Sequence, residues 1–318
     1  MKITKVNNYT FPAKNAQGSQ RVLESLSKEL TKQGHSIELL ISQDSIVPSE
    51  YGKLVNKVSE DTDIIHLHGG LLYEYNLLPV KPWITTAHGG ATDAPERLAE
   101  VGKYVDNIVF VSNFCSKMYN SDCFVYACAD KNEFQFQEKK DNYFLWMAGT
   151  DWGNQKGLFH TILLAKKLGF KLKIAGGGKN QEIIDEIKKN QNSKIEYLGF
   201  VNGKEKTALL AGARATFMIG TILDACPLTS IESWASGTPV IARNIGVHPE
   251  VVKSSVGFVC NSEIDIIKAI ATIDKIKPLD CRRYFLENFT SEIAAKKYVE
   301  IYKNVLKTGK VIVGCQER

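Results

Sequence analysis

Asp224 and Glu232 form the most informative pair of chemically competent residues in the sequence. They stand at the spacing D-x7-E after a short apolar run, with Pro227 between them. Because proline favours the first turn of a helix, we expect Asp224 in a loop and Glu232 about a turn and a half inside the helix. The backbone N–H groups of Leu228 to Ser230 would then hold a phosphate, and the carboxylates would hold hydroxyl groups. An acidic loop followed by a surface glutamate produces the same pattern, so the pair alone leaves both interpretations open.

Lys156 stands at the beginning of another expected helix, Leu158–Leu168, after the strand pattern Tyr143–Ala148. The helix dipole disfavours a cation at that position unless an anion lies between them. The sequence therefore favours a phosphate site at Lys156. A solvated lysine, at a cost of a few tenths of a kcal/mol, is the alternative.

Three histidines stand near the carboxyl ends of two successive strand patterns. His66 and His68 precede one pair of glycines, and His88 precedes another. Imidazoles can bind a metal ion, but no carboxylate stands convincingly beside them, so we expect no metal site. Hydrogen-bonded strand ends, with His88 where a cleft would open, are the favoured interpretation.

Two glycine-containing turns are weaker signals. Gly18 opens an amphipathic helix, where backbone N–H groups could approach an anion, and a plain turn with Ser19 as N-cap fits equally well. Gly176–Gly178 also follows a strand pattern, but Gln181 occupies the position where a dinucleotide fingerprint needs its third glycine. The sequence therefore disfavours a dinucleotide site there.

Short β-branched runs alternate with helical patterns along the chain, which predicts an α/β fold with two doubly wound parallel sheets. The expected strands of the first series are Ile3–Val6, Ile37–Ile41, Ile64–Leu67, Trp83–Ala87, Ile108–Val111 and Cys123–Ala127. Those of the second series are Tyr143–Ala148, Leu172–Ala175, Ile195–Leu198, Thr216–Ile219, Pro239–Ala242 and Gly257–Cys260. The polar segment Lys131–Asn142 between the series is typical of a linker. We expect domains at 1–135 and 136–290, followed by a helix and tail at 291–318 whose apolar stripe packs on a neighbouring surface, for example back across the cleft.

Composition bounds the class of protein. The 318 residues are 44% hydrophobic and 24% charged, as in ordinary globular proteins. Neither a membrane-spanning apolar stretch nor a signal-peptide pattern is present, so we expect a cytoplasmic protein. Seven irregularly placed cysteines predict neither a disulfide framework nor a zinc site. The net charge of +5, with lysines dispersed among glutamates, suits anionic small molecules or a weak peripheral membrane contact and argues against nucleic acid.

The order and spacing of the motifs resemble glycosyltransferase family 4, the retaining GT-B glycosyltransferases (glycosyl transferases group 1), over nearly the whole chain. The segments that carry the resemblance are Gly18 with Arg21, Asp63–Gly69, Thr86–Gly90, Val109–Lys117, Lys156–Gly157, Ile195–Val201, Asp224–Glu232 with Gly237–Ala242, Gly246–Val252 and Asn288–Thr290. The resemblance implies two Rossmann-like domains facing across a cleft, the N-terminal one on the acceptor side and the C-terminal one binding a nucleotide sugar. It also implies a hexosyltransferase of glycan biosynthesis that needs no metal or other cofactor. The donor would be a nucleotide diphosphate sugar, with a UDP-sugar favoured, and the acceptor a carbohydrate, a lipid or a small molecule.

The resemblance also implies roles by position. Lys156 would neutralise the donor diphosphate, Asp224 would contact the donor sugar and His88 would face the sugar and the acceptor. The implied nucleotide-binding residues are Gly18, Gly199, Phe200, Val201, Cys226, Leu228, Thr229 and Glu232. Among these, Glu232 would hold the ribose hydroxyls, the N–H groups of Leu228 and Thr229 would meet the phosphate, and Gly199 to Val201 would flank the base.

Four positions depart from the family pattern. Asp224 stands where the family usually has Glu, and Thr150 replaces an arginine before the lysine. Gln17–Gly18 replaces a glycine pair, and Ala127–Cys128 replaces an Asn-Gly. Two alternatives stay open beside transfer: a GT-B sugar-nucleotide epimerase, and a non-catalytic protein of this fold that binds nucleotides or sugars.

Overall fold

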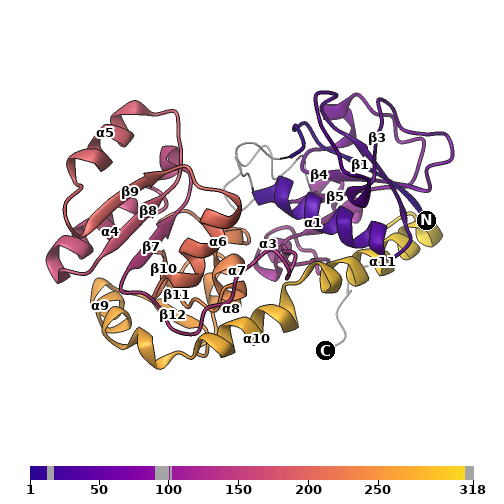
Figure 1. The fold of residues 1–318 in the computed structure, drawn as a ribbon. Coiled ribbons are helices and arrows are strands. Elements are labelled where there is room, and N and C mark those ends of the chain that lie inside the picture. The colour runs from indigo at the N-terminus through magenta and orange to yellow at the C-terminus, as the bar shows by residue number, and fades with distance from the viewer. Residues whose placement is uncertain (13–17, 90–99, 101, 312–318) are drawn as a thin grey trace. The chain divides into compact units, whose positions relative to one another are not determined.

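The computed structural model describes residues 1–12, 18–89, 100 and 102–311. Gln17 of the first loop, Gly90 and the end of the tail, 312–318, lie outside the described residues. The chain forms two compact units, Met1–Asp130 with Phe289–Arg318, and Lys131–Asn288 (Figure 1). Each unit is an α/β layer structure around its own parallel sheet, which confirms the predicted fold class.

The sheet of the first unit has six parallel strands in the order β3-β2-β1-β4-β5-β6. Their bounds are β1 (Lys2–Val6), β2 (Ser36–Leu40), β3 (Lys53–Leu54), β4 (Ile64–His68), β5 (Trp83–Ala87) and β6 (Ile108–Phe110). Strand order reverses between β1 and β4, where Ile3 pairs with Ile64 and Lys5 with His66. Such a reversal opens a crevice at the carboxyl ends of the strands, the usual ligand position in open α/β sheets.

The helices of this unit include α1 (Gly18–Lys32), α3 (Asn113–Met118) and α11 (Ser291–Thr308). Helix α11 returns from the end of the chain and packs beside α1 (Figure 1). Its buried stripe is the expected one, Ala294, Ala295, Tyr298, Ile301, Tyr302 and Val305. Two of these residues reach polar groups of the sheet, Tyr302 at His66 and Tyr298 at Thr86, so the helix covers this sheet with hydrogen bonds as well as apolar surface.

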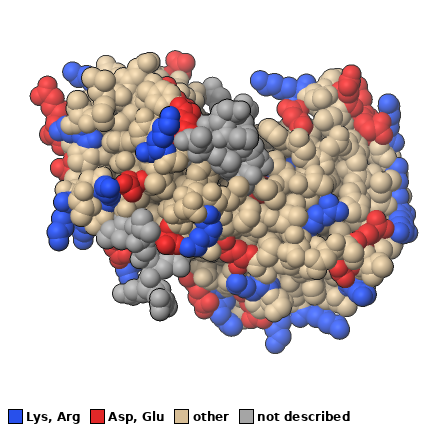
Figure 2. Space-filling model, turned by 180° about the vertical axis from the view of Figure 1, so that it is seen from behind, with Lys and Arg blue, Asp and Glu red and all other residues tan. Residues whose placement is uncertain are grey.

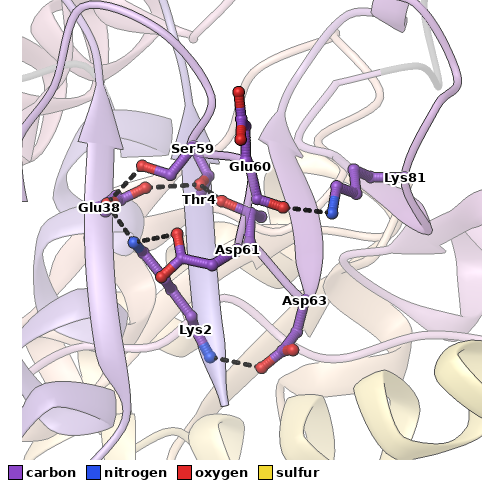
Figure 3. Close-up of polar contacts among 9 residues, drawn as sticks. Lys2, Thr4, Glu38, Ser59, Glu60, Asp61, Asp63 and Lys81 are labelled. Carbon is purple, nitrogen blue, oxygen red and sulfur yellow. Dashed lines mark hydrogen bonds and ion pairs between the residues drawn. The ribbon is translucent and has the colours of Figure 1, made fainter.

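A polar network closes the amino ends of the strands in the first unit (Figure 3). Lys2 Nζ lies 2.9 Å from Glu38 and 2.6 Å from Asp61, and its backbone N–H donates to Asp63 at 2.8 Å. Glu38 is buried and also accepts from Ser59 at 2.8 Å and from Thr4 at 3.2 Å. This cluster ties β1, β2 and the approach to β4 together at the edge opposite to the carboxyl ends, so we assign it to the scaffold.

The second unit repeats the topology, with its strands in the order β12-β11-β10-β7-β8-β9. The strands are β7 (Phe144–Met147), β8 (Leu172–Ala175), β9 (Ile195–Gly199), β10 (Thr216–Met218), β11 (Val240–Arg243) and β12 (Gly257–Cys260). The helices are α4 (Leu158–Leu168), α5 (Gln181–Lys189), α6 (Gly203–Gly212), α7 (Leu228–Ala235), α8 (His248–Val251), α9 (Glu263–Thr272) and α10 (Pro278–Asn288). Here the strand order reverses between β7 and β10, so this pair marks the expected ligand position of the unit.

One expected strand was wrong. Cys123–Ala127 forms only a bridge from Phe124 to Phe110 and two backbone hydrogen bonds at the edge of β6. Its apolar residues are buried all the same, which explains why the pattern resembles a strand. The two-residue strand β3 was missed because Lys53–Leu54 has no apolar alternation to detect.

Acidic and basic side chains are interspersed on the face shown in Figure 2, without one extended patch of a single sign. This distribution agrees with the dispersed lysines of the sequence. In the part of the chain that the structure describes, no helix combines the length and apolar character that crossing a membrane requires.

Candidate functional site

Lys156 and Asp224 meet at the carboxyl edge of the sheet in the second unit. Lys156 lies in the connection from β7 to α4, and Asp224 in the connection from β10 to α7. Lys156 Nζ forms an ion pair and hydrogen bond with Asp224 Oδ1. The two residues that the sequence singled out separately therefore share one site, at the point where the strand order reverses.

Glycines let the two loops approach closely enough for this contact. Gly157 adopts a φ of +77°, and a Cβ there would lie 2.8 Å from the backbone of Ile219. A Cβ at Gly220 would lie 2.3 Å from the carbonyl oxygen of Gln155, which also accepts a hydrogen bond of 2.7 Å from the Thr221 N–H. Any larger residue at these glycines would push the Lys156 loop away from the end of β10.

Asp224 is held from the opposite side by the segment before α8. Gly246, with a φ of +57°, lets the chain pass so close that a Cβ would lie 2.9 Å from the Asp224 backbone. Val247 N–H donates to the Asp224 carbonyl at 3.1 Å. His248 then places its Nε2 3.5 Å from Asp224 Oδ2.

The electrostatics of Asp224 favour its charged form. Burial acts to raise the pKa of this carboxyl, but the neighbouring imidazole of His248 and the charge of Lys156 outweigh it and hold the pKa below the ordinary value. The Lys156 side chain is 24% exposed and that of Asp224 12%. An incoming anion can therefore reach the ammonium group more easily than the carboxylate.

Helix α7 begins beside this ion pair. Pro227 is its N-cap, and no side-chain hydrogen bond caps the helix. The first N–H groups of a helix, here from Leu228 and Thr229, have no partner inside the helix and carry its positive potential. Cys226, just before them, is half-buried, and Thr229 Oγ1 donates to the Met147 carbonyl at 3.4 Å. The start of α7 and Lys156 thus both offer positive potential near the ends of β7 and β10.

Glu232 lies inside α7 and is buried, with 1% of its side chain exposed. Lys206 of α6 places Nζ 2.6 Å from Glu232 Oε2. The second carboxylate of the D-x7-E pair is therefore also compensated by a lysine. Lys206 was not predicted from the sequence, because nothing in the local pattern distinguishes it from the other dispersed lysines.

The end of β9 contains the three residues expected to flank a base. Gly199 has a φ of +71° and its carbonyl accepts from Gly176 N–H at 2.8 Å. Phe200 is 46% exposed and packs on Gly177, where a Cβ would lie 3.1 Å from its own Cβ. Val201 is buried. The exposed ring of Phe200 is the surface in this segment that a planar ligand could contact.

Thr150 and Asp151 organise the glycine turn beside Phe200. Thr150, which stands where the family has arginine, is buried, and its N–H donates to Gly177 at 3.0 Å. The Asp151 carboxylate accepts the N–H groups of Lys179 and Asn180 at 2.8 Å, which lowers its pKa. Because position 150 is threonine and not arginine, Lys156 is the cation that the sequence predicted at this site.

In the first unit, His66 and Thr86 join the sheet to α11 in a buried hydrogen-bonded cluster. His66 lies 2.7 Å from Tyr302 OH through Nδ1 and 2.7 Å from Thr86 Oγ1 through Nε2. Thr86 Oγ1 in turn lies 2.7 Å from Tyr298 OH. Burial, followed by the charge of Lys5, lowers the pKa of His66 well below the ordinary value, so this imidazole is neutral at pH 7.

His88 follows the end of β5 and lies at the open side of this cluster. His88 is half-buried, and its Nε2 is 3.1 Å from Nδ1 of the buried His68. Burial and then the charge of Lys5 lower the pKa of His88 to about 4. His88 therefore interacts with ligands as a neutral imidazole. Gly18, exposed at the beginning of α1, belongs to the same unit as His88.

Lys5 is the second residue that the sequence analysis missed. It lies on β1 beside His66, is fully buried, and its Nζ makes no hydrogen bond to any described residue. Burial lowers its pKa to about 7. In the sequence it occupies an inward position of a strand, which could have identified it, since lysine is rarely buried without a partner.

Among the described residues, no group of three or more His, Cys, Asp or Glu side chains is arranged to hold a metal ion.

Comparisons with known proteins address the family. Residues 129–285 match the family model of glycosyl transferases group 1. An uncharacterized 41.2 kDa protein in the cps region of Klebsiella pneumoniae is 24% identical over 76% of this chain and 79% of its own length. An uncharacterized glycosyltransferase of Methanocaldococcus jannaschii is 24% identical over 47% of this chain and 42% of its own length.

Solved structures share the fold over nearly the whole chain. AviGT4, a glycosyltransferase involved in avilamycin A biosynthesis, superposes with a TM-score of 0.78 at 21% identity, covering 97% of this chain and 98% of its own. Sucrose-phosphate synthase from Thermosynechococcus elongatus gives 0.79 at 14% identity, covering 96% and 99%. HepE of Anabaena, in complex with UDP-glucose, gives 0.70 at 11% identity, covering 96% and 100%. The chain thus has the GT-B fold of glycosyltransferases, and its residues 129–285 carry the sequence pattern of the glycosyl transferases group 1 family.

Proposed function

We propose that this protein is a retaining, metal-independent hexosyltransferase of the cytoplasm. It moves a sugar from a nucleotide diphosphate sugar, with a UDP-sugar favoured, to a carbohydrate, lipid or small-molecule acceptor. The observation that carries the proposal is the contact between Lys156 and Asp224 beside the start of α7, at the reversal of strand order in the second unit.

The leaving group of such a reaction is a nucleoside diphosphate, which gains negative charge as its bond to the sugar breaks. Lys156 and the N–H groups of Leu228 and Thr229 are fixed donors that stabilise this charge. The contacts of Gly157 and Gly220 hold the Lys156 loop in place, so little reorganisation of this loop accompanies the reaction. A fixed cation and a helix N-terminus supply the charge stabilisation for which other enzymes use a divalent metal ion.

The remaining residues orient the donor. Asp224, charged and 12% exposed, accepts hydrogen bonds from hydroxyl groups of the donor sugar. Glu232 holds the ribose hydroxyls. The other residues proposed to contact the nucleotide are Gly18, Gly199, Phe200, Val201 and Cys226. The exposed ring of Phe200 lies against the base. His88, neutral at pH 7, faces the sugar and the acceptor and contributes hydrogen bonds without adding charge.

The ligands of neighbouring structures support a nucleotide-sugar donor. HepE of Anabaena was solved with UDP and with UDP-glucose, and starch synthase IV of Arabidopsis thaliana with ADP and acarbose. These proteins share the fold of this chain at 11 to 13% identity, so they support the donor class and leave the base and the sugar to experiment.

Binding of UDP, ADP and GDP, measured by calorimetry, tests the nucleotide site. We expect one of them to bind, and Lys156→Ala to weaken this binding while Lys167→Ala does not. Lys167 is a suitable control because it lies on the adjoining helix α4 and pairs with the exposed Glu263 at 2.8 Å. Failure of all three nucleotides to bind would exclude the donor site proposed here.

Turnover then tests the reaction. Transfer should persist in excess chelator, and NMR should show a product with the anomeric configuration of the donor. Strict dependence on Mn²⁺ or Mg²⁺, or an inverted product, would contradict the proposal. Interconversion of the nucleotide sugar without any acceptor would identify an epimerase instead, and binding without turnover of any donor would favour the non-catalytic alternative.

A further inference from the structure

His248 stands directly behind the proposed diphosphate site and has no role in the function proposed above. Its side chain is 2% exposed, and its Nδ1 lies 3.1 Å from the carbonyl oxygen of Arg243. A carbonyl oxygen only accepts hydrogen bonds, so Nδ1 carries a hydrogen. In the neutral imidazole, Nε2 then has a lone pair and no hydrogen.

That lone pair faces a carboxylate. Nε2 is 3.5 Å from Asp224 Oδ2, at the outer limit of a hydrogen bond, and it makes no hydrogen bond within the described part of the chain. Two acceptors facing each other do not attract. A proton on Nε2 would turn the contact into a charge-assisted hydrogen bond, since both ring nitrogens of an imidazolium donate.

The charge that balances Asp224 in this structure comes from Lys156. In the proposed function, Lys156 must also serve the diphosphate, which brings at least two further negative charges to the same site. Asp224 then shares its lysine, and His248 becomes the group best placed to restore the balance by accepting a proton. Asp224 would keep its orientation toward the donor sugar through His248.

We infer that His248 is a positioning residue that takes up a proton when a nucleoside diphosphate binds and so holds Asp224 in place while Lys156 engages the phosphates. This inference rests on the proposed function and assigns a partner to its site. The buried His248 Nε2, aimed at the second oxygen of Asp224, is the observation that carries it.

Few other groups compete for this proton. The titratable side chains on the segments next to His248 include Asp224, Lys156, Cys226, Arg243, Glu250 and, from α10, Tyr284. Burial raises the pKa of Tyr284 to about 12, so it does not titrate near pH 7. Lysine and arginine are already protonated at that pH and cannot accept a proton.

Calorimetry in two buffers of different ionisation enthalpy measures the number of protons taken up on binding. At pH 7.5 an ordinary histidine is mostly neutral and a phosphate with a pKa of about 6 is already ionised, so we expect uptake of about half a proton or more per nucleotide. The probes are UDP, ADP and GDP. The wild type should show uptake with whichever of them binds.

Two variants of His248 separate proton uptake from simple structural support. His248→Asn keeps an amide N–H near the position of Nδ1, so Arg243 retains its donor, but it lacks Nε2 and should lose both the uptake and most of the nucleotide affinity above pH 7. His248→Gln places a permanent amide donor near Nε2, so it should restore affinity without uptake. His160→Asn, which removes a histidine 3.4 Å from the exposed Glu263, should leave both quantities unchanged.

The outcomes are distinguishable. Nucleotide binding without proton uptake, or uptake that persists in His248→Asn, would overturn this inference and leave the proposed function intact. Absence of binding by all three nucleotides would overturn both. If His248→Asn does not fold, the wild type still decides, because the Cε1–H resonance of His248 must shift to the imidazolium position when nucleotide is added at pH 7.5.

Discussion

Lys5 offers a quantitative test of the buried polar cluster in the first unit. Its Nζ is fully buried beside His66 without a hydrogen bond to any described residue, and burial lowers its pKa from 10.5 to about 7. Between pH 7 and pH 10.5, Lys5 binds a proton in the unfolded chain but not in the folded protein. Stability therefore increases with pH through this window, and the cost of the buried charge is complete below pH 7.

Lys5→Met removes this cost while keeping a side chain of similar length. The difference of about 3.5 units between 10.5 and 7 corresponds to about 5 kcal/mol for the fully buried ammonium. From pH 6 to pH 9 the free energy of unfolding of the wild type should rise by about 3 kcal/mol relative to Lys5→Met. The variant should be the more stable protein at pH 6, because methionine has no charge to bury.

Urea unfolding at several pH values, with hydrogen exchange of the β1 and β4 peptides measured by mass spectrometry, reports the first unit separately from the second. The difference in the free energy of unfolding between wild type and variant excludes the contribution of the cysteines and tyrosines, because these residues titrate in both proteins. Lys2→Met is the matched control on the same strand, since the pKa of Lys2 is raised by Asp61 and Glu38 and its contribution is constant below pH 10. A wild type and a Lys5→Met variant whose stabilities run parallel from pH 6 to pH 9 would refute the reasoning.

Three further predictions concern the proposed site. Lys156→Ala should reduce kcat/KM about a hundredfold, the effect of losing about 3 kcal/mol of preorganised charge stabilisation, and unchanged kinetics in a folded variant would make Lys156 a solvated lysine. His88→Ala should bind nucleoside diphosphate nearly as well as the wild type yet transfer sugar poorly, because His88 orients the sugar and the acceptor; equal losses in both assays would contradict this role. Lys206→Ala should lower the free energy of unfolding by about 3 to 5 kcal/mol in urea titrations, because the buried Glu232 would lose the lysine 2.6 Å from it, and a loss below 1 kcal/mol would contradict a stabilising role for this ion pair.

Much of the fold was predictable because its parallel strands are buried and rich in β-branched and apolar residues. Trp83–Ala87, Leu172–Ala175 and Gly257–Cys260 were expected at their observed bounds. The apolar stripe of α11 was also evident from its helical spacing. The surface on which α11 packs could not be predicted, because an apolar stripe does not specify its partner. In the structure, Tyr302 and Tyr298 make polar contacts with His66 of β4 and Thr86 of β5.

The candidate site was predictable as a set of residues but not as a set of contacts. Lys156 and Asp224 were singled out for their places after strands, and the structure joins them because β7 and β10 are adjacent in the sheet. The sequence could not show this adjacency, which depends on the strand order. His248 lies in the segment Gly246–Val252 that the sequence singled out, yet its position next to Asp224 depends on the close approach at Gly246, a contact between segments that are separated in the chain.

The two carboxylates of the D-x7-E pair each have a lysine partner, which bears on the role proposed for them at a sugar nucleotide. A buried carboxylate without compensation would raise its pKa, become protonated and lose part of its capacity to accept hydrogen bonds. Lys206 pairs with Glu232 from α6, and Lys156 pairs with Asp224 from the loop before α4, so each carboxylate has a cationic partner. The two pairs differ in exposure, because Lys206 is 11% exposed and Lys156 is 24% exposed. The more accessible lysine is thus the one proposed to exchange part of its contact for the diphosphate, while the more buried pair keeps α6 and α7 together.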